Sequence, residues 1–318
     1  MNRRREFLIA LGAVPWTAQA QKGRPRTLGA LDPFPNSSIT EGELRNWLRH
    51  SGYSDIELQR VVVLGSNGRD DLLPRLATQL VALRPAVILT WGDAAVQAAQ
   101  AATTDIPIVV MTDNLVGAGH VSSLNRPGGN VTGISVMSTE LDAKRLELLA
   151  PILPPRSTVM LLADAVTSPL SRPALHRTAA MLGLQLIEVT VRTLEEMQRA
   201  LADARKSGIV GVNVLASPLL FAQSEHLIGW ANGQRLPAIF EWGFLADKGA
   251  LVAYGPLIEP LYRRLFKQVV GLMRGGHVND FPVEQPTSFE FVINLRTSRA
   301  VGVEIPQQLM LRADRVIG

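Results

Sequence analysis

Residues 86–112 have the sequence AVILTWGDAAVQAAQAATTDIPIVVMT, in which two apolar runs flank an alanine-rich segment. The runs at 86–90 and 106–111 are typical of buried strands. Asp93 lies just before the helix predicted over 94–102, where its side chain would cap the first free amide groups. A strand, a helix and a second strand in this order form a βαβ unit, so we expect both strands to lie parallel in one sheet.

The same alternation extends on both sides of this unit. Upstream, a Ser38–Glu41 capping box predicts a helix between two strands. Downstream, a Thr193–Glu196 capping box predicts another helix. The remaining predicted elements are strands at 27–31, 60–64, 131–136, 158–163, 184–191, 209–215, 237–242, 289–294 and 309–313, and a helix at 260–274.

Two similar halves are indicated, because a shift of 130 residues superposes the segment 106–111 on 236–241. We therefore predict an α/β fold of two doubly wound lobes with parallel sheets, joined by a hinge of several chain crossings. The crossings are expected near 130–135, 250–255 and 281–286. The lobes would comprise 21–132 with about 256–283, and 133–255 with about 284–318.

The first 20 residues have the three parts of a secretory signal. Arg3–Arg5 form a cationic start, an apolar run extends over 7–16, and Ala18 and Ala20 form an A-x-A pattern. The apolar run is too short for a membrane span, which needs about 20 residues. Arg4–Arg5 with the following residues resemble the twin-arginine export motif, and the general secretory route is the alternative. We expect a soluble periplasmic protein after signal removal.

The composition excludes several classes of protein. The chain has 318 residues, 47% of them hydrophobic, which suffices for two packed domains. Cysteine is absent, so disulfides and thiolate sites are excluded. The net charge is +4, and +2 without the three arginines and one glutamate of the predicted signal, so nucleic acid is not an expected partner. The five histidines lack metal-ligand spacing, and we predict no metal, no cofactor and no catalytic residue.

Ligands of open α/β sheets bind at the carboxyl ends of the strands, where loops and helix N-termini converge. With two facing lobes, both sets of strand-end loops would line one cleft. The candidate ligand-binding residues in these loops are Asp32, Thr90, Trp91, Gly92, Thr112, Asp113, Asn114, Asp164, Ser168, Ala216, Ser217, Glu241 and Trp242.

The chemistry of these candidates suits an amino acid. Trp91 and Trp242 could stack on a planar or apolar group, and the acidic side chains could pair with an ammonium. The hydroxyl side chains, with free amides at helix starts, could hold a carboxylate. Each type also has a structural alternative, because a tryptophan at a strand end is often a core residue and an aspartate before a helix is often a cap.

Several motifs resemble those of the ABC transporter substrate-binding family, the group that includes tryptophan- and tyrosine-binding importers. They are RPGGNVTGIS (126–135), KRLELL (144–149), GALVAYGP (249–256) and VEQPTSFEFVINL (283–295). The resemblance spans nearly the whole chain after the signal. Where the family commonly has Asp-Pro-Val after the fourth strand, this chain has Asn114, Leu115 and Val116, so the resemblance does not imply the identity of the ligand.

The resemblance implies a periplasmic binding protein fold of type I, which closes around a small ligand and delivers it to an ABC permease in the inner membrane. An aromatic amino acid is the favoured ligand, with a branched-chain amino acid, a small carboxylate or a nucleoside-like compound as alternatives. We expect a monomer. The alternative functions are a periplasmic sensor that presents its ligand to a membrane receptor and an enzyme, for which Asp164, Ser168 and His176 lack a recognised spacing.

Overall fold

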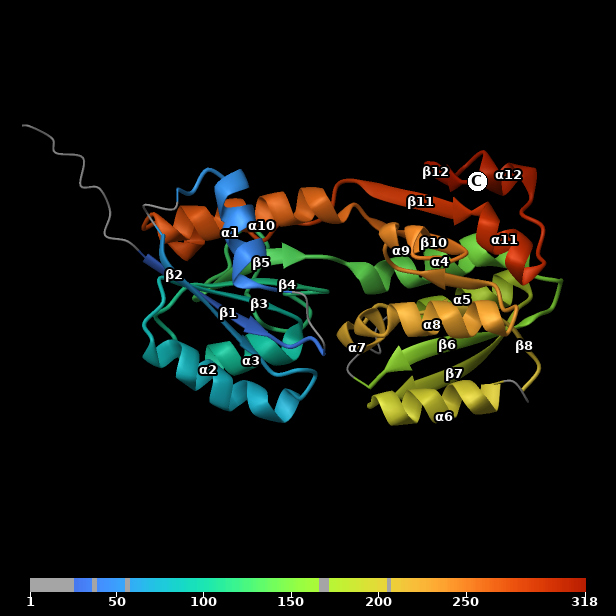
Figure 1. Cartoon of the computed structure of the whole chain (residues 1–318), viewed down its shortest axis with the longest axis horizontal. Helices are drawn as coiled ribbons and strands as arrows, with labels where there is room; N and C mark the ends of the chain where they lie inside the picture. Colours follow the sequence, from blue (N-terminus) through green and yellow to red (C-terminus); the bar gives the residue numbers. More distant parts are fainter. Residues whose placement is uncertain (1–25, 36–38, 55–57, 166–171, 205–206) are drawn as a thin grey trace, which may run out of the picture.

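The computed structural model describes residues 26–35, 39–54, 58–165, 172–204 and 207–318. The predicted signal at 1–20 therefore lies outside the described residues. Two lobes lie side by side, each built on a sheet with helices on both faces (Figure 1). The prediction of a two-lobed α/β fold is confirmed. Among the described residues, no helix is both long and apolar enough to cross a membrane.

The first lobe contains a parallel sheet of five strands in the order β2-β1-β3-β4-β5. The strands β3, β4 and β5 are buried along their whole length because helices cover both faces of the sheet. Helices α1 (Glu41–His50) and α10 (Ile258–Met273) lie on one face, and α2 (Leu73–Ala82) and α3 (Asp93–Ala102) on the other. The strands are β1 (Arg26–Asp32), β2 (Leu58–Gly65), β3 (Val87–Trp91), β4 (Ile108–Thr112) and β5 (Val131–Ser135).

The second lobe contains a sheet of seven strands in the order β12-β11-β10-β9-β8-β6-β7. Its strands are β6 (Thr158–Asp164), β7 (Gln185–Val191), β8 (Ile209–Val214), β9 (Ala238–Phe240), β10 (Val252–Pro256), β11 (Phe289–Asn294) and β12 (Arg315–Ile317). One face packs on α4 (Asp142–Leu149) and α5 (Arg172–Leu182), the other on α6 (Leu194–Ala204), α7 (Pro218–Ala222) and α8 (Ser224–Gly233). Short helices near its end are α9 (Phe244–Asp247), α11 (Leu295–Val301) and α12 (Gln307–Met310).

The first five strands of each lobe have the same order in space, because β7-β6-β8-β9-β10 repeats β2-β1-β3-β4-β5. The sequence repeat of 106–111 on 236–241 corresponds to β4 and β9. Not all of the second sheet is parallel, since β11 runs antiparallel to β10. Between β10 and β11 the chain forms α10, which packs on the first lobe. The chain therefore returns to the second sheet from the side of the first lobe, and β11 runs in the opposite direction to β10.

The chain passes between the lobes three times, after β5, after β10 and before β11. The first and third crossings lie side by side: Ser135 N donates to Glu284 O at 2.8 Å, and Glu284 N donates to Gly133 O at 3.0 Å. Gln268 of α10 adds a bond from Nε2 to Pro282 O at 3.1 Å. The first sheet extends through Ser135, three residues beyond the expected lobe boundary at 132.

Helix starts follow the predictions only in part. The capping box of α1 is formed by Thr40 and Glu43, two residues after the predicted pair, and Ser38 lies outside the described residues. Both pairs match the same pattern, so local sequence does not separate them. The prediction for Asp93 is wrong: Gly92, at φ 74°, is the N-cap of α3, and Asp93 is its first residue.

Among the later elements, the predicted cap of α6 is confirmed and the predicted strand at 309–313 is wrong. Thr193 Oγ1 accepts a hydrogen bond from Glu196 N at 3.1 Å, as predicted for α6. The strand predicted at 309–313 is instead the helix α12 followed by a turn, and the last strand is β12, which pairs parallel with β11. The buried Leu309 fits an apolar core in either conformation, and short apolar runs do not distinguish the two.

Candidate functional site

The carboxyl ends of the parallel strands of the two lobes face each other (Figure 1). The lobes are in direct contact there: the rings of Phe34, after β1, and Phe221, in α7, have centroids 6.0 Å apart at an edge-to-face angle of 62°. Phe34 also contacts Trp91, and Phe221 contacts Phe244, with centroids 6.4 and 6.2 Å apart. A row of four aromatic side chains therefore crosses from one lobe to the other.

The apolar core is continuous across this contact. A single cluster of buried side chains includes Leu28 and Trp91 of the first lobe and Leu162 and Phe240 of the second. At Gly92, a Cβ atom would lie 3.4 Å from Cγ of Pro218, which is ordinary van der Waals contact. The two lobes are thus closed on each other at the strand ends.

A charged pair lies fully buried beside the chain crossings. Arg145 and Asp142, one turn apart on α4, are both 0% exposed, and their Nη2 and Oδ1 atoms are 2.5 Å apart. Arg145 also donates to the carbonyl oxygens of Ser138, at 2.7 Å, and Tyr254, at 3.2 Å. The pair thereby ties α4 to both the first crossing and β10, and removing one partner would leave a buried charge alone.

Several polar atoms near this pair are buried without a hydrogen-bond partner among the described residues. They are Nε of Arg145, Oγ of Ser138 and Oδ1 of Asn213. Asn213 is anchored through its Nδ2, which donates to Asp142 O at 3.1 Å. Buried polar atoms usually bind protein, water or ligand, so these three atoms form a cluster with unused hydrogen-bonding capacity.

Glu241 lies close to the same pair, directly after β9. Burial raises the pKa of its carboxyl group to about 8, although the charge of Arg145 and the side chain of Trp242 act in the opposite direction. The charges of Asp142 and Asp113 add to the rise. Glu241 also borders a cavity of about 10 Å³, roughly the space of one water molecule. A cationic group placed beside Glu241 would stabilise its ionised form.

Asp113 fixes the first crossing to the first lobe. Its Oδ1 accepts from Thr139 N at 3.0 Å, and its Oδ2 accepts from Thr139 Oγ1 at 2.5 Å. Its backbone oxygen accepts from Met137 N and from Ser135 Oγ. Both carboxylate oxygens therefore accept hydrogen bonds within the protein. The charge of Asp113 affects the site by raising the pKa of Glu241.

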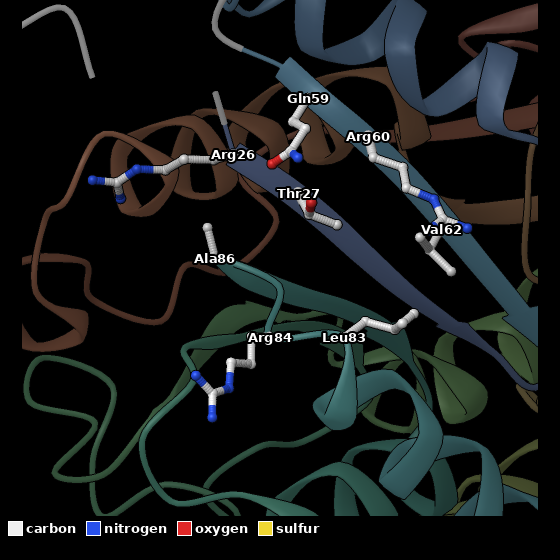
Figure 2. A pocket seen from close by; sticks show the side chains of 8 residues that line it. All are labelled: Arg26, Thr27, Gln59, Arg60, Val62, Leu83, Arg84 and Ala86. Atoms are coloured by element: carbon white, nitrogen blue, oxygen red, sulfur yellow. The ribbon is translucent and has the colours of Figure 1, made fainter. Parts of the chain in front are cut away.

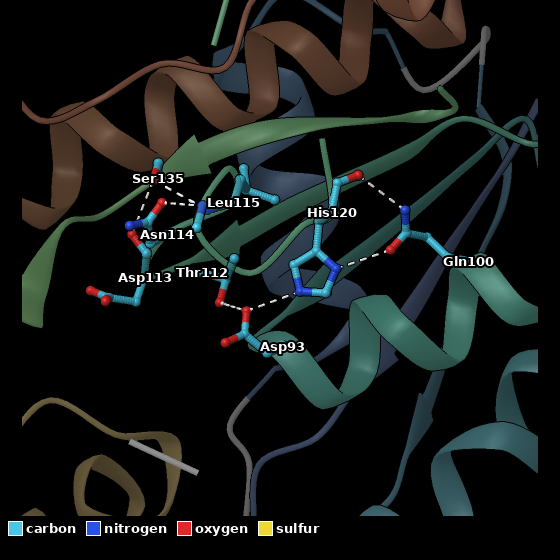
Figure 3. A network of polar contacts seen from close by, with 9 residues as sticks. Asp93, Gln100, Thr112, Asp113, Asn114, Leu115, His120 and Ser135 are labelled. Atoms are coloured by element: carbon cyan, nitrogen blue, oxygen red, sulfur yellow. Dashed lines mark hydrogen bonds and ion pairs between the residues drawn. The ribbon is translucent and has the colours of Figure 1, made fainter. Parts of the chain in front are cut away.

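A second polar network lies at the end of β4 (Figure 3). Asp93 Oδ1 accepts from Thr112 Oγ1 at 2.8 Å and lies 3.2 Å from Nε2 of His120, whose Nδ1 is 3.0 Å from Gln100 Oε1. Burial alone would raise the pKa of Asp93, but the hydrogen bonds with His120 and Thr112 lower it below its usual value. The network stabilises the β4 loop, and the Thr112 hydroxyl is used within it.

The remaining first-lobe candidates lie at the strand ends, mostly in structural roles. Thr90 is fully buried and donates to Leu31 O at 2.8 Å. Trp91 is 2% exposed and packs in the core, with its Nε1 near the Tyr262 hydroxyl but outside hydrogen-bonding geometry. Asn114 Oδ1 accepts from Gly117 N at 2.8 Å, and Asp32 Oδ1 accepts from Phe34 N at 2.9 Å.

The second-lobe candidates also gather at the strand ends. Asp164 ends β6 and is buried. The pKa of Asp70, in the first lobe, is raised mainly by the burial of Asp70 itself and secondly by the charge of Asp164 across the interface. Ser217 caps α7 by accepting from Leu220 N at 3.0 Å, next to Ala216. Trp242 is 8% exposed and belongs to the continuous core. Ser168 lies outside the described residues.

Sequence reasoning missed Phe34, Phe221, Asp142 and Arg145. A signal was present for the last two, because Asp142 and Arg145 share one face of α4 with Leu146 and Leu149, and charged residues on an apolar helix face are unusual. Phe34 lies two residues after the candidate Asp32, and Phe221 lies in α7, four residues after the candidate Ser217.

Comparisons with known proteins agree with this architecture. The tyrosine-binding protein of Clostridioides difficile is 28% identical over 268 residues, which is 81% of this chain and 74% of that protein. The ABC domain in complex with L-Trp from Streptococcus pneumoniae has a TM-score of 0.81 at 21% identity, covering 92% of this chain and 100% of that chain. The ligand-free, open structure of a substrate-binding protein with adhesive properties from Clostridium difficile has a TM-score of 0.61 at 21% identity, covering 92% and 99%.

The match to a family model covers most of the sequence. Residues 37–317 match the model described as ABC transporter substrate binding protein, so the match includes the first lobe after β1, the second lobe and all three crossings. The resemblance inferred from the sequence motifs is thereby confirmed. This chain belongs to the ABC transporter substrate-binding protein family.

Proposed function

We propose that this protein holds an amino acid, with an aromatic side chain favoured, between its two lobes and delivers it to an ABC permease. The observation that carries the proposal is the meeting of both sets of strand ends, which places a row of aromatic rings and several acidic side chains at one interface. Such a mixture suits a ligand with an apolar body and charged ends.

The acidic groups supply the contact for an ammonium. Glu241, with its raised pKa, gains most from a cation because burial otherwise opposes its ionisation. The charge of Asp164 acts on Asp70 across the interface, and a cation placed near both would relieve their repulsion. The apolar part of the ligand would pack on the aromatic rings of Phe34 and Phe221.

The relatives support an amino acid as the ligand. One curated relative is named for tyrosine binding, and one solved relative holds L-Trp. The lobe arrangement is also more similar to that complex, at a TM-score of 0.81, than to the ligand-free, open structure, at 0.61. Binding would then stabilise a closed form like the one that the structure describes.

The other parts of the proposal follow from this role. Opening and closure would occur at the three crossings, and the permease would recognise the closed rims of the lobes. The protein would act as a monomer in the periplasm after removal of its signal, and it would release the ligand chemically unchanged. Asp113 and Thr139 would act as a fixed point of the hinge because their two hydrogen bonds join the first crossing to β4.

A thermal-shift screen of the purified protein tests the proposal. Amino acids, small carboxylates, sugars and nucleosides would each be added, and only amino acids should raise the melting temperature. A ligand at a hundred times its Kd adds about 2.7 kcal/mol of stability. Stabilisation by another class alone, or recovery of a chemically altered ligand, would contradict the proposal.

Variants at the aromatic contact locate the ligand. Phe34→Ala and Phe221→Ala should each weaken amino acid binding about tenfold or more, as measured by calorimetry, because each removes a ring from the interface. They are preferable to Trp91→Ala, which would open a cavity in the core. Leu311→Ala, at a side chain 80% exposed, is the control and should bind as the wild type does. Unchanged affinity in both phenylalanine variants would place the ligand elsewhere.

A further inference from the structure

A second cavity lies in the first lobe, at the end of the sheet that is opposite the lobe interface. It has a volume of about 410 Å³ and is formed where β1, β2 and β3 begin and α2 ends. Binding sites for small molecules typically have volumes of about 300 to 1,000 Å³, so this cavity is large enough for one. Its walls are Arg26, Thr27, Gln59, Arg60, Val62, Leu83, Arg84 and Ala86 (Figure 2).

The described walls of this cavity carry charge of one sign. Arg26, Arg60 and Arg84 come from three different segments, and no acidic side chain is among the described lining residues. None of the three guanidinium groups has a hydrogen-bond or ion-pair partner among the residues that the structure describes. Elsewhere in the chain, arginines such as Arg69 and Arg315 pair with neighbouring carboxylates. A concave surface lined by one sign of charge concentrates ions of the opposite sign.

Structural roles explain these arginines only one at a time. Arg84 follows the C-terminus of α2, where the helix dipole favours a cation. Arg60 lies on β2, an edge strand, where a charge discourages pairing with another chain. Neither role accounts for three guanidinium groups around one cavity that have no carboxylate partner among the described residues.

We propose that this cavity binds a small organic or inorganic anion that carries at least two carboxylate or phosphate groups. The guanidinium fork matches both groups, since it can donate two parallel hydrogen bonds to their oxygens. Arg26 and Arg84 extend toward one side of the cavity and Arg60 toward the other, so a ligand with charges at separate positions engages both sides (Figure 2). Val62 and the partly exposed Leu83 provide apolar wall between them.

Calorimetric titration with citrate and with inorganic pyrophosphate tests this site. At low ionic strength, the full chain should bind at least one of them saturably with one-to-one stoichiometry, and added NaCl should weaken binding. The double variant Arg60→Gln with Arg84→Gln should lose about tenfold or more in affinity. Arg199→Gln, which removes an exposed arginine from α6 in the other lobe, is the matched control and should bind as the wild type does.

Three results would overturn the proposal: no saturable binding of either anion, equal affinity in the double variant, or an equal loss in the control. The last two would mean that the anion binds nonspecifically to positive surface. Amino acid binding is measured on the same variants and should not change, because the cavity lies at the far edge of the first lobe. A negative result for anion binding would therefore not contradict the proposed function, and a negative result for amino acid binding would not contradict the anion site.

Discussion

Glu241 illustrates how a single carboxyl group is affected by its surroundings. It directly follows β9 in the interior of the second lobe, where burial raises its pKa to about 8 despite the nearby Arg145. At neutral pH the group is therefore mostly protonated. A bound ammonium would favour its ionised form, so amino acid binding should release protons from the protein below about pH 8.

The substitution Glu241→Gln should change how stability depends on pH. The folded-state pKa lies above the unfolded value of 4.5, so the folded protein holds a proton that the unfolded chain has lost between these values. The free energy of unfolding of the wild type should therefore fall as pH rises from about 4.5 to 8, relative to the variant. The maximal slope is about 1.4 kcal/mol per pH unit. Denaturant titrations at several pH values measure this difference.

The control for Glu241→Gln is Glu225→Gln. Glu225 is an exposed acid of α8 that pairs with Lys248, and its loss should leave the pH dependence nearly unchanged. Parallel stability curves for the wild type and Glu241→Gln would show that the carboxyl group is not protonated in the folded protein.

At the level of elements, glycines permit the close packing of strands at the crossings. At Gly133 in β5, an added Cβ atom would lie 1.8 Å from Val110 O of β4. At Gly255 in β10, it would lie 1.7 Å from Glu241 O, just after β9. These are corresponding places in the two lobes, since β5 follows β4 as β10 follows β9 in sheet order.

Gly133→Ala should destabilise the first lobe by about 3 kcal/mol or more, because the methyl group would separate β4 from β5. Thermal and denaturant unfolding measure the loss. Gly129→Ala provides the comparison, since an added Cβ there meets no atom within 4 Å. Similar stability of the two variants would mean that β5 is not paired as described.

Thr40 and Glu43 together determine the start of α1. Thr40 Oγ1 accepts from Glu43 N at 3.2 Å, and Glu43 Oε2 accepts from Thr40 N at 3.1 Å. Thr40→Ala should lower the free energy of unfolding by about 1 kcal/mol. Thr78→Ala removes an exposed threonine whose hydroxyl bonds within α2, and it should have little effect. Equal effects of both changes on denaturant unfolding would argue against the cap.

For the whole molecule, the charges of Asp70 and Asp164 at the interface oppose closure. The pKa of Asp70, in the first lobe, is raised mainly by burial. The charge of Asp164 in the second lobe and the charge of Asp71, which is adjacent to Asp70 in sequence, raise it further. Because closure raises this pKa, ionisation of Asp70 at higher pH favours the open form. The aromatic contact between Phe34 and Phe221 acts in the opposite direction.

Asp70→Asn should therefore favour the closed form. The radius of gyration from small-angle X-ray scattering, measured without ligand, should be smaller in this variant than in the wild type at neutral pH. The radius of gyration should also increase less with pH in this variant than in the wild type. Asp71→Asn is the adjacent control, because Asp71 is exposed and pairs with Arg69 instead. A larger radius in Asp70→Asn would reverse the assigned sign of the interaction.

The sequence predicted the strands and their alternation with helices because buried parallel strands require continuous apolar runs, such as 86–90 and 106–111. The repeat of 106–111 on 236–241 also indicated two lobes of one topology, which β4 and β9 now represent. Local signals did not suffice at the helix starts, since Ser38–Glu41 and Thr40–Glu43 have the same pattern. They also did not separate helix from strand at Leu309.

Composition, periodicity and motifs by themselves determined the α/β class, the doubled architecture and the family of this protein. The tertiary structure alone decided which side chains meet, because residues far apart in the chain become neighbours only after both lobes have folded and closed. Phe34 and Phe221 are in contact across 187 positions of sequence. The burial that shifts the pKa of Glu241 likewise depends on elements from several parts of the chain. Local sequence carries no record of such long-range contacts, since desolvation and charge act through space.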